Sequence, residues 1–208
     1  MVVKRVSSLS SPDLASTDSV PIRVLVEQCL AGQSTSMFAL VEQYQCRVFG
    51  LCYRMLGNRV DAEDVTQETF LRVFRSLHRW DANRDFLPWL FAIAGNRCRT
   101  FLVKRAHHTH FQLIDNLVSE SLGNSNEADS EFDLGEEIQL ALAQLKDNHR
   151  LAFILFHEQQ LSYNEIARSM DCPVGTVKTW IHRARKELAR WLARRNPELG
   201  KKNVLQSI

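Results

Sequence analysis

One stretch near the end of the chain gathers side chains that suit DNA binding. Hydroxyl, imidazole and cationic groups share one face of a predicted helix over residues 174–188; they are Thr176, Lys178, Thr179, His182, Arg183, Arg185 and Lys186. Such groups donate hydrogen bonds to phosphates and to base edges in a major groove, which admits an α-helix. The face therefore indicates duplex recognition, with a solvated cationic surface as the alternative, since Lys and Arg are mostly exposed in any protein.

The residues before this face predict a helix-turn-helix. Ser162 and Glu165 have the spacing of a capping box, which starts a first helix directly after Ser162. Asp171 tolerates the left-handed conformation of a tight turn, and Pro173 presets the backbone for a new helix near Val174. A short turn between two helices directly ahead of the cationic face favours DNA binding over the solvated alternative.

The second predicted helix also has a buried side. Val177, Ile181, Ala184 and Leu188 recur at intervals of four, three and four residues, which places them on one stripe. This stripe is opposite the cationic face, so the helix can pack on a core while its polar side stays exposed.

Helical periodicity also dominates the rest of the chain, and it predicts an all-α protein. Helices are expected from Pro21 to Ala31, from Ser34 or Ser36 to Gly57, from Asp61 to Arg79, from Phe86 to Arg105, from Leu134 to Leu145 and from Asn148 to Gln159. Ser34 or Ser36 is expected to cap the second of these helices, and Asp61 the third.

The pattern divides the chain into two small helical domains joined by a flexible acidic linker. The expected segments are a disordered leader at 1–20, a first helical domain at 21–105, the linker at 106–133, a second domain at 134–195 and a polar tail at 196–208. Eight Asp or Glu and no Lys or Arg occur from Ala106 to Leu145, whereas Lys178 to Arg195 holds seven Lys or Arg and one Glu. The middle is thus acidic and the end basic.

Composition narrows the class of protein further. The net charge is only +2, and the five cysteines form no CxxC pair, so neither a zinc finger nor a disulfide framework is predicted. Each cysteine is expected to be a small buried hydrophobe. No apolar run approaches the roughly twenty residues that span a bilayer, and no signal peptide is apparent, so we expect a cytoplasmic protein without membrane insertion.

Three stretches in order resemble the extracytoplasmic-function (ECF) sigma factors of bacterial RNA polymerase. They are Gly57–Phe74, Pro88–Arg97 and Leu161–Leu188, and the resemblance covers about residues 22–195. It implies that the first domain is a region-two helical bundle and the second a region-four helix-turn-helix. It also implies an alternative sigma factor that binds polymerase core and directs promoter recognition, strand opening and transcription initiation.

The resemblance assigns three surfaces. The residues implied to dock on the clamp coiled coil of the largest polymerase subunit are Asp61, Asp64, Gln67, Glu68, Leu71 and Phe74. Those implied to open the minus-ten element and hold its melted non-template strand are Asn83, Arg84, Trp89, Asn96, Arg97, Arg99, Lys104 and Arg105. The cationic face of residues 176–186 is implied to read the duplex minus-thirty-five element. Trp180 and Asp171 depart from the family's usual residues.

Structural alternatives stay open for several of these side chains. The acidic face could be merely solvated with Phe70 and Phe74 in the core, and Trp89 has the spacing of a core residue. The acidic linker resembles the family's connector, which runs through polymerase channels that otherwise hold nucleic acid; a plain linker is the alternative. The family further implies an anti-sigma factor as a partner, association with the nucleoid when bound to polymerase, and no cofactor.

Two other classes of function are alternatives for this sequence. A free-standing transcription factor would bind duplex promoter DNA without polymerase, but it would not need the stretch from Trp80 to Arg105. An enzyme would need ligands or acid-base groups, for which the candidates are Asp61, Glu63, Asp64 and Glu68, or His107, His108 and His110. The Glu-x-x-His pairs of helical di-metal sites are missing, and so are phosphate loops and nucleophile elbows, so catalysis is not expected.

Overall fold

The computed structural model describes residues 20–116 and 134–195, which are helical and linked by short turns. The helices are α1 (Ile22–Leu30), α2 (Ser34–Leu56), α3 (Arg59–Ser76), the 3₁₀ turn η1 (Leu77–Arg79), α4 (Phe86–Asn116), α5 (Leu134–Ala143), α6 (Asp147–His157), α7 (Tyr163–Ser169) and α8 (Val174–Arg195). The all-α prediction is confirmed. Residues 1–19, 117–133 and 196–208, which hold most of the predicted leader and linker and all of the predicted tail, lie outside the described residues.

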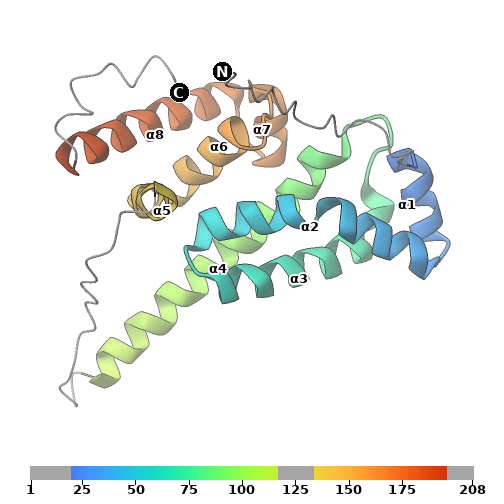
Figure 1. The fold of residues 1–208 in the computed structure, drawn as a ribbon, viewed down its shortest axis with the longest axis horizontal. Coiled ribbons are helices and arrows are strands. Elements are labelled where there is room, and N and C mark those ends of the chain that lie inside the picture. The colour runs from blue at the N-terminus through green and yellow to red at the C-terminus, as the bar shows by residue number, and fades with distance from the viewer. Residues whose placement is uncertain (1–19, 117–133, 196–208) are drawn as a thin grey trace, which may run out of the picture.

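Helices α1 to α4 form a bundle around an apolar core (Figure 1). Leu40, Val48 and Leu51 of α2 are fully buried, and so are Leu90 and Phe91 of α4. Burial of such side chains is the main stabilising contribution of a helical bundle, at roughly 1.5–3 kcal/mol each. This bundle provides the rigid support for the loop between η1 and α4.

The predicted C-terminal end of α2 is confirmed, whereas its predicted N-terminal cap is not. Gly57 has φ +73° and ends the helix in the left-handed conformation, which glycine adopts without steric cost. At the other end Gln33 occupies the cap position and no side chain caps the helix, so the predicted cap by Ser34 or Ser36 is wrong. Ser36 is buried and its hydroxyl instead donates to Gln28 Oε1 at 2.8 Å, joining α2 to α1.

Helix α3 begins earlier than predicted. Asn58 is its cap, because the Asn58 side-chain oxygen accepts from the Asp61 backbone N–H at 3.1 Å. The prediction that Asp61 caps the helix is therefore wrong, and the Asp61 carboxylate is left free to pair elsewhere. Its position in the first turn still suits the positive end of the helix dipole.

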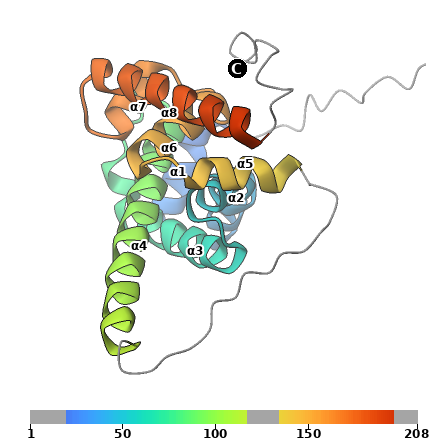
Figure 2. The ribbon, with the colours of Figure 1, turned by 90° about the vertical axis from the view of Figure 1, so that its left-hand side faces the viewer.

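Helix α4 also differs from its predicted bounds. It was expected to end at Arg105, where helical periodicity weakens, but the described helix continues to Asn116. Histidine and threonine in this stretch are weak helix formers rather than breakers, and glutamine is a good helix former, so the helix persists beyond the predicted end. Figure 2 shows the far end of α4 extending away from the bundle.

The second domain packs directly on the first. Helices α5 and α6 contact α2, and α7 contacts α4 (Figures 1 and 2). One cluster of buried apolar side chains runs through both domains, joining Leu51 and Phe91 of the bundle to Leu151, Ile154 and Ile166. The two predicted domains thus share a core in this structure. None of the described helices combines the length and apolar character needed to cross a membrane.

The cysteines follow their prediction only in part. Cys29, Cys52 and Cys98 are buried, and the sulfurs of Cys52 and Cys98 lie 3.7 Å apart in the core. Cys46 is exposed and Cys172 is half-buried, so the expectation of burial is wrong for these two. Cys46 lies on the solvent-exposed side of α2.

Candidate nucleic-acid interface

The helix-turn-helix is built as its local sequence predicts. The Ser162 hydroxyl accepts from the Glu165 backbone N–H at 3.3 Å, and the Glu165 carboxylate accepts from the Ser162 N–H at 2.7 Å. Asp171 adopts φ +49°, which turns the chain between α7 and α8. Helix α8 begins at Val174, so both the capping box and the start of the second helix are confirmed.

Helix α8 buries the predicted stripe. Val177, Ile181 and Ala184 are inaccessible, and Leu188 is half-buried against Leu142 and the neighbouring apolar side chains of a second small cluster. Because this stripe is anchored on α5, α6 and α7, the opposite face of α8 is fixed in orientation. A preorganised helix face lowers the entropic cost of binding.

The cationic face of α8 is open to solvent. Lys178, Thr179, His182, Arg183 and Lys186 are exposed, and Thr176 and Arg185 are half-buried. Among the described residues, the side chains of His182, Arg183 and Lys186 have no hydrogen-bond or ion-pair partner. Their donors are available to an external acceptor such as a phosphate or a base edge.

Two further cations of this face rest on aromatic side chains of the same domain. The Lys178 ammonium lies 5.7 Å from the Tyr163 ring centre, and the Arg185 guanidinium 5.5 Å from that of Phe156. Arg185 Nε also donates to His157 Nε2 at 3.2 Å. This bond requires a neutral His157, and burial together with the nearby Arg185 charge lowers the pKa of that imidazole. These contacts hold the two cations at the edge of the face.

A second polar surface surrounds the loop between η1 and α4. Residues 81–85 are exposed, and the loop is tightened by the Asn83 N–H donating to Asp81 Oδ1 at 3.0 Å. Arg84 pairs with the same carboxylate at 3.1 Å. Asn83 and Arg84 therefore lie together at an exposed tip, as their predicted contact with an extruded base requires.

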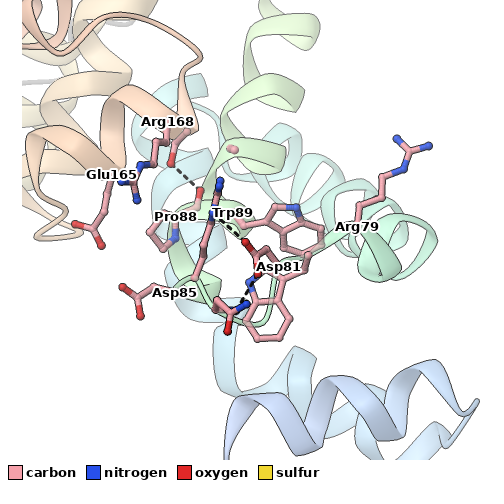
Figure 3. Close-up of a pocket in the computed structure, with 12 residues that line it drawn as sticks. Arg79, Asp81, Asp85, Pro88, Trp89, Glu165 and Arg168 are labelled. Carbon is pink, nitrogen blue, oxygen red and sulfur yellow. Dashed lines mark hydrogen bonds and ion pairs between the residues drawn. The ribbon is translucent and has the colours of Figure 1, made fainter.

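Aromatic side chains line the base of this loop. Phe86 is buried, with the Trp80 ring edge-on at 5.4 Å and the Trp89 ring tilted at 5.5 Å. Trp89 is only half-buried and borders a pocket of about 300 Å³ together with the loop (Figure 3). Trp89 therefore fits both predicted roles, because it packs on the core and also faces the pocket.

The basic residues predicted on α4 are largely engaged within the protein. Arg97 is only 9% exposed and its guanidinium pairs with Glu68 of α3. Arg105 pairs with Asp61 at 3.3 Å. The Arg99 guanidinium donates to Asn148 of α6 at 3.2 Å and also to Asn96. Lys104 is exposed.

A groove between α3 and α4 adds cations that sequence reasoning missed. Its volume is about 490 Å³, and it is lined by Arg72, Arg75, Ser76, Arg79, Ile93, Asn96, Arg97 and Thr100. Arg72, Arg75 and Arg79 are exposed. Their spacing of three and four residues, which puts them on one helix face, was the available signal.

The acidic face of α3 is exposed as predicted. Asp64, Gln67 and Glu68 are accessible to solvent, and Leu71 is 57% exposed beside them. Phe70 is buried, whereas Phe74 and Asp61 are half-buried. An exposed leucine among acids and amides has the character of a protein interface.

The alternative of a metal enzyme gains no support from these residues. Over residues 20–106 and 135–195, whose side chains are described, no group of three or more His, Cys, Asp or Glu side chains could hold a metal ion. The side chains of His107, His108 and His110 lie outside that part of the chain.

Comparison with known proteins finds a match for each of the two helical domains. Residues 40–108 match the pattern of sigma-70 region 2, and residues 135–188 match that of sigma-70 region 4. The chain is 31% identical over 181 residues to the ECF RNA polymerase sigma factor SigW of Bacillus subtilis, covering 82% of this chain and 96% of the relative. It is 32% identical over 176 residues to the ECF RNA polymerase sigma-E factor of Escherichia coli, covering 80% and 91%.

A solved structure shares the fold. The sigma factor RpoE of Bartonella quintana, crystallised with the anti-sigma factor NepR, has a TM-score of 0.60 at 24% identity, covering 73% of this chain and 93% of that one. The family is not known to be enzymatic. On the matches to both regions and to these relatives, the chain belongs to the ECF family of RNA polymerase sigma factors, which bind polymerase core and direct promoter recognition and transcription initiation.

Proposed function

We propose that α8 reads the minus-thirty-five element of the promoter as duplex. The residues are Thr176, Lys178, Thr179, His182, Arg183, Arg185 and Lys186. The observation that supports this most directly is the exposed, unbonded state of His182 and Arg183 on a helix whose other side is buried. Arginine reads guanine through two parallel hydrogen bonds, and a free guanidinium on a fixed helix suits that role. Lys178 and Arg185 are assigned to the phosphates at the groove edge.

The loop at residues 81–85 and the polar residues of α4 capture the melted non-template strand of the minus-ten element. The residues are Asn83, Arg84, Trp89, Asn96, Arg97, Arg99, Lys104 and Arg105. Support comes from the pocket bordered by Trp89, since an aromatic face and a nearby cation are what hold an unstacked base. We add Arg72, Arg75 and Arg79 of the neighbouring groove, which offer cations to the phosphates of the same strand.

The acidic face of α3 docks on the clamp coiled coil of the largest polymerase subunit. Its residues are Asp61, Asp64, Gln67, Glu68, Leu71 and Phe74. Leu71 supplies exposed apolar area, and the surrounding acids supply the charge that steers a basic partner. The domains that carry these surfaces are residues 21–105, extended by the rest of α4, and residues 134–195.

The protein acts by binding and strand capture rather than by bond chemistry, in the cytoplasm at the nucleoid, where its polymerase and promoters are. An anti-sigma factor is proposed as a further partner. The support is that the structurally similar RpoE of Bartonella quintana was crystallised with the anti-sigma factor NepR.

Run-off transcription on a set of candidate promoters tests this function, with the purified protein and bacterial core polymerase each present alone or together. Permanganate reactivity of unpaired thymines reports strand opening. Transcripts and opening are expected only when both components are present, and Asp64→Lys should reduce both by weakening core binding. Tight duplex binding without core, and no opening with it, would instead identify a free-standing regulator.

A further inference from the structure

Four ring-bearing side chains of α6 and α7 line up beside one flank of α8, which packs on both helices (Figures 1 and 2). The ring centres of Phe153 and His157 are 4.4 Å apart. Phe156 lies between His157 and Tyr163, at 5.0 Å from the first ring and 4.8 Å from the second. All four side chains are half-buried. Rings at such separations attract one another, so they form one continuous support, named here the ring stack.

The ring stack lies under two cations of the α8 face. The Lys178 ammonium is 5.7 Å from the centre of the Tyr163 ring, and the Arg185 guanidinium is 5.5 Å from that of Phe156. A cation is attracted to the face of an aromatic ring at such distances. Arg185 follows Lys178 by seven residues, which is about two turns or roughly 10.5 Å of helix, so both extend from the same side of α8. The ring stack therefore supports two cations along one edge of the DNA-reading face.

Arg185 is held by a directional bond as well. Its Nε donates to His157 Nε2 at 3.2 Å, and this bond joins α8 to α6. Arginine only donates, so the imidazole must be neutral and must carry its proton on Nδ1. Burial and the nearby Arg185 charge lower the pKa of His157, which favours that neutral form. The bond fixes the plane of the guanidinium through Nε, while the two terminal nitrogens have no hydrogen-bond partner among the described residues.

Other polar side chains of the same face are not held in this way. His182, Arg183 and Lys186 are exposed, and their side chains have no hydrogen-bond or ion-pair partner among the residues that the structure describes. Phosphates recur at fixed places along a duplex whatever its sequence, whereas base edges change from pair to pair. A cation that is set in advance suits a phosphate, and a side chain that can adjust suits a base edge. The division between held and unheld side chains therefore matches the two kinds of contact.

We propose that His157 and Tyr163 are positioning residues for promoter binding, which hold the Arg185 guanidinium and the Lys178 ammonium in place for the phosphates beside the minus-thirty-five element. The proposal rests on the duplex-reading role proposed above for α8. A long side chain that is ordered before binding loses less conformational entropy when it meets its phosphate. Because phosphate contacts set the register of a protein on a duplex, the ring stack also helps to fix where the other side chains of α8 meet the base edges.

Three substitutions at His157 separate positioning from packing. His157→Gln keeps an acceptor, because its amide oxygen reaches the place of Nε2, whereas the shorter side chain of His157→Asn does not reach Arg185. His157→Phe keeps a ring and loses the acceptor. The measurement is the affinity of the reconstituted holoenzyme for a fluorescent promoter duplex that yields run-off transcripts with the wild type. His157→Asn and His157→Phe should weaken binding about twofold to tenfold, because Arg185 must then be ordered on binding, and His157→Gln should stay within about twofold of the wild type.

Arg185→Ala gives a readout that a packing role of His157 would not produce. Loss of one phosphate contact should reduce the slope of log affinity against log salt by about 0.9. In the Arg185→Ala background His157→Phe should have no further effect on affinity, since a positioning residue acts only through the side chain that it holds. If His157→Phe lowers the melting temperature, His157→Asn takes its place in this comparison. A loss of affinity that persists without Arg185, or one that is equal in His157→Gln and His157→Phe, overturns the proposal.

The second cation is tested in the same titration. Tyr163→Leu removes the ring under Lys178 and should weaken binding, whereas Tyr163→Phe keeps the ring and should not; the difference should vanish when Lys178→Ala is added. Arg183→Ala in parallel monitors the proposed function itself. A base-dependent loss in Arg183→Ala, with full affinity in His157→Phe and Tyr163→Leu, overturns the positioning roles alone. No loss in Arg183→Ala would instead contradict the reading of the duplex by α8.

Discussion

The cationic side chains of α8 and those of α4 are held in opposite ways. On α8, His182 and Arg183 are exposed without a hydrogen-bond partner among the described residues. On α4, Arg97 is buried against Glu68, and Arg105 is bonded to Asp61. Both helices present DNA-binding chemistry in the sequence, but Arg97 and Arg105 of α4 are paired within the protein, whereas Arg183 of α8 is not.

The difference indicates how each region engages DNA. On the proposed assignment, the Arg183 guanidinium of region four can contact duplex DNA without first breaking a contact within the protein. In region two the partners of the α4 arginines are Glu68 and Asp61, which belong to the proposed polymerase-docking face of α3. The residues proposed for strand capture and those proposed for polymerase docking are therefore joined by ion pairs. Binding at one surface would change the charge environment of the other.

The largest expected effect is on promoter binding by the exposed, unpaired Arg183 of α8. Arg183→Ala should weaken minus-thirty-five recognition by about 1–3 kcal/mol, a factor of roughly 5 to 150, and the loss should depend on the base contacted. The measurement is binding of the reconstituted holoenzyme to duplexes in which each position of the element is permuted. Thermal stability should change by less than about 0.5 kcal/mol, because the side chain is exposed.

Arg190→Ala provides the matched control for this substitution. Arg190 is exposed on the same helix but lies about two turns beyond Arg183. Its removal should lower affinity for all sequences alike and only slightly. If Arg183→Ala behaves in the same uniform way, Arg183 contacts phosphate rather than a base edge.

For the ion-paired Arg97 of α4 we expect a loss of stability instead. Arg97→Ala should lower the free energy of unfolding by about 1–2 kcal/mol, since it removes a largely buried side chain and leaves Glu68 without its partner. Urea unfolding followed by circular dichroism measures this. Lys104→Ala, an exposed cation on the same helix, should leave stability unchanged. Equal stability of the two variants would show that the ion pair contributes nothing to the fold.

Local sequence was enough to predict the helix-turn-helix. The capping box of Ser162 and Glu165, the left-handed Asp171 and the apolar stripe of α8 all act within a few residues, so spacing alone reveals them. The free state of the α8 cations follows from the same pattern, because residues opposite a buried stripe face solvent.

Features that depend on distant residues were not predictable in this way. The pairing of Arg97 with Glu68 joins positions 29 residues apart, and the contact of Gly95 with Leu151 depends on how whole domains pack. The Asn58 cap was missed because Asp61, three residues later, is also a good capping residue. Tertiary packing selects between such equivalent local choices.

The smallest expected effect is a pH-dependent loss of stability that is larger in region four than in region two. Burial lowers the pKa of His149 despite the nearby Glu187, and burial and then Arg185 lower that of His157. Both lie on α6, beside α8. A histidine with a lowered pKa stabilises the fold fully above its ordinary value of about 6.5, and that stabilisation is lost as pH falls toward the lowered pKa. Acidification should therefore loosen region four first.

Hydrogen exchange at pH 7.5 and 5.5, corrected for intrinsic rates, measures this difference. Amides of α8 should lose more protection at pH 5.5 than amides of α2, because the Arg185 bond to His157 requires a neutral imidazole. His157→Gln keeps an acceptor for Arg185 but does not titrate, so it should reduce the loss in α8. Equal loss of protection in α2 and α8 would mean that these imidazoles do not govern the response. A selective loss would show that the free reader of duplex DNA is also the region whose packing depends on a neutral imidazole.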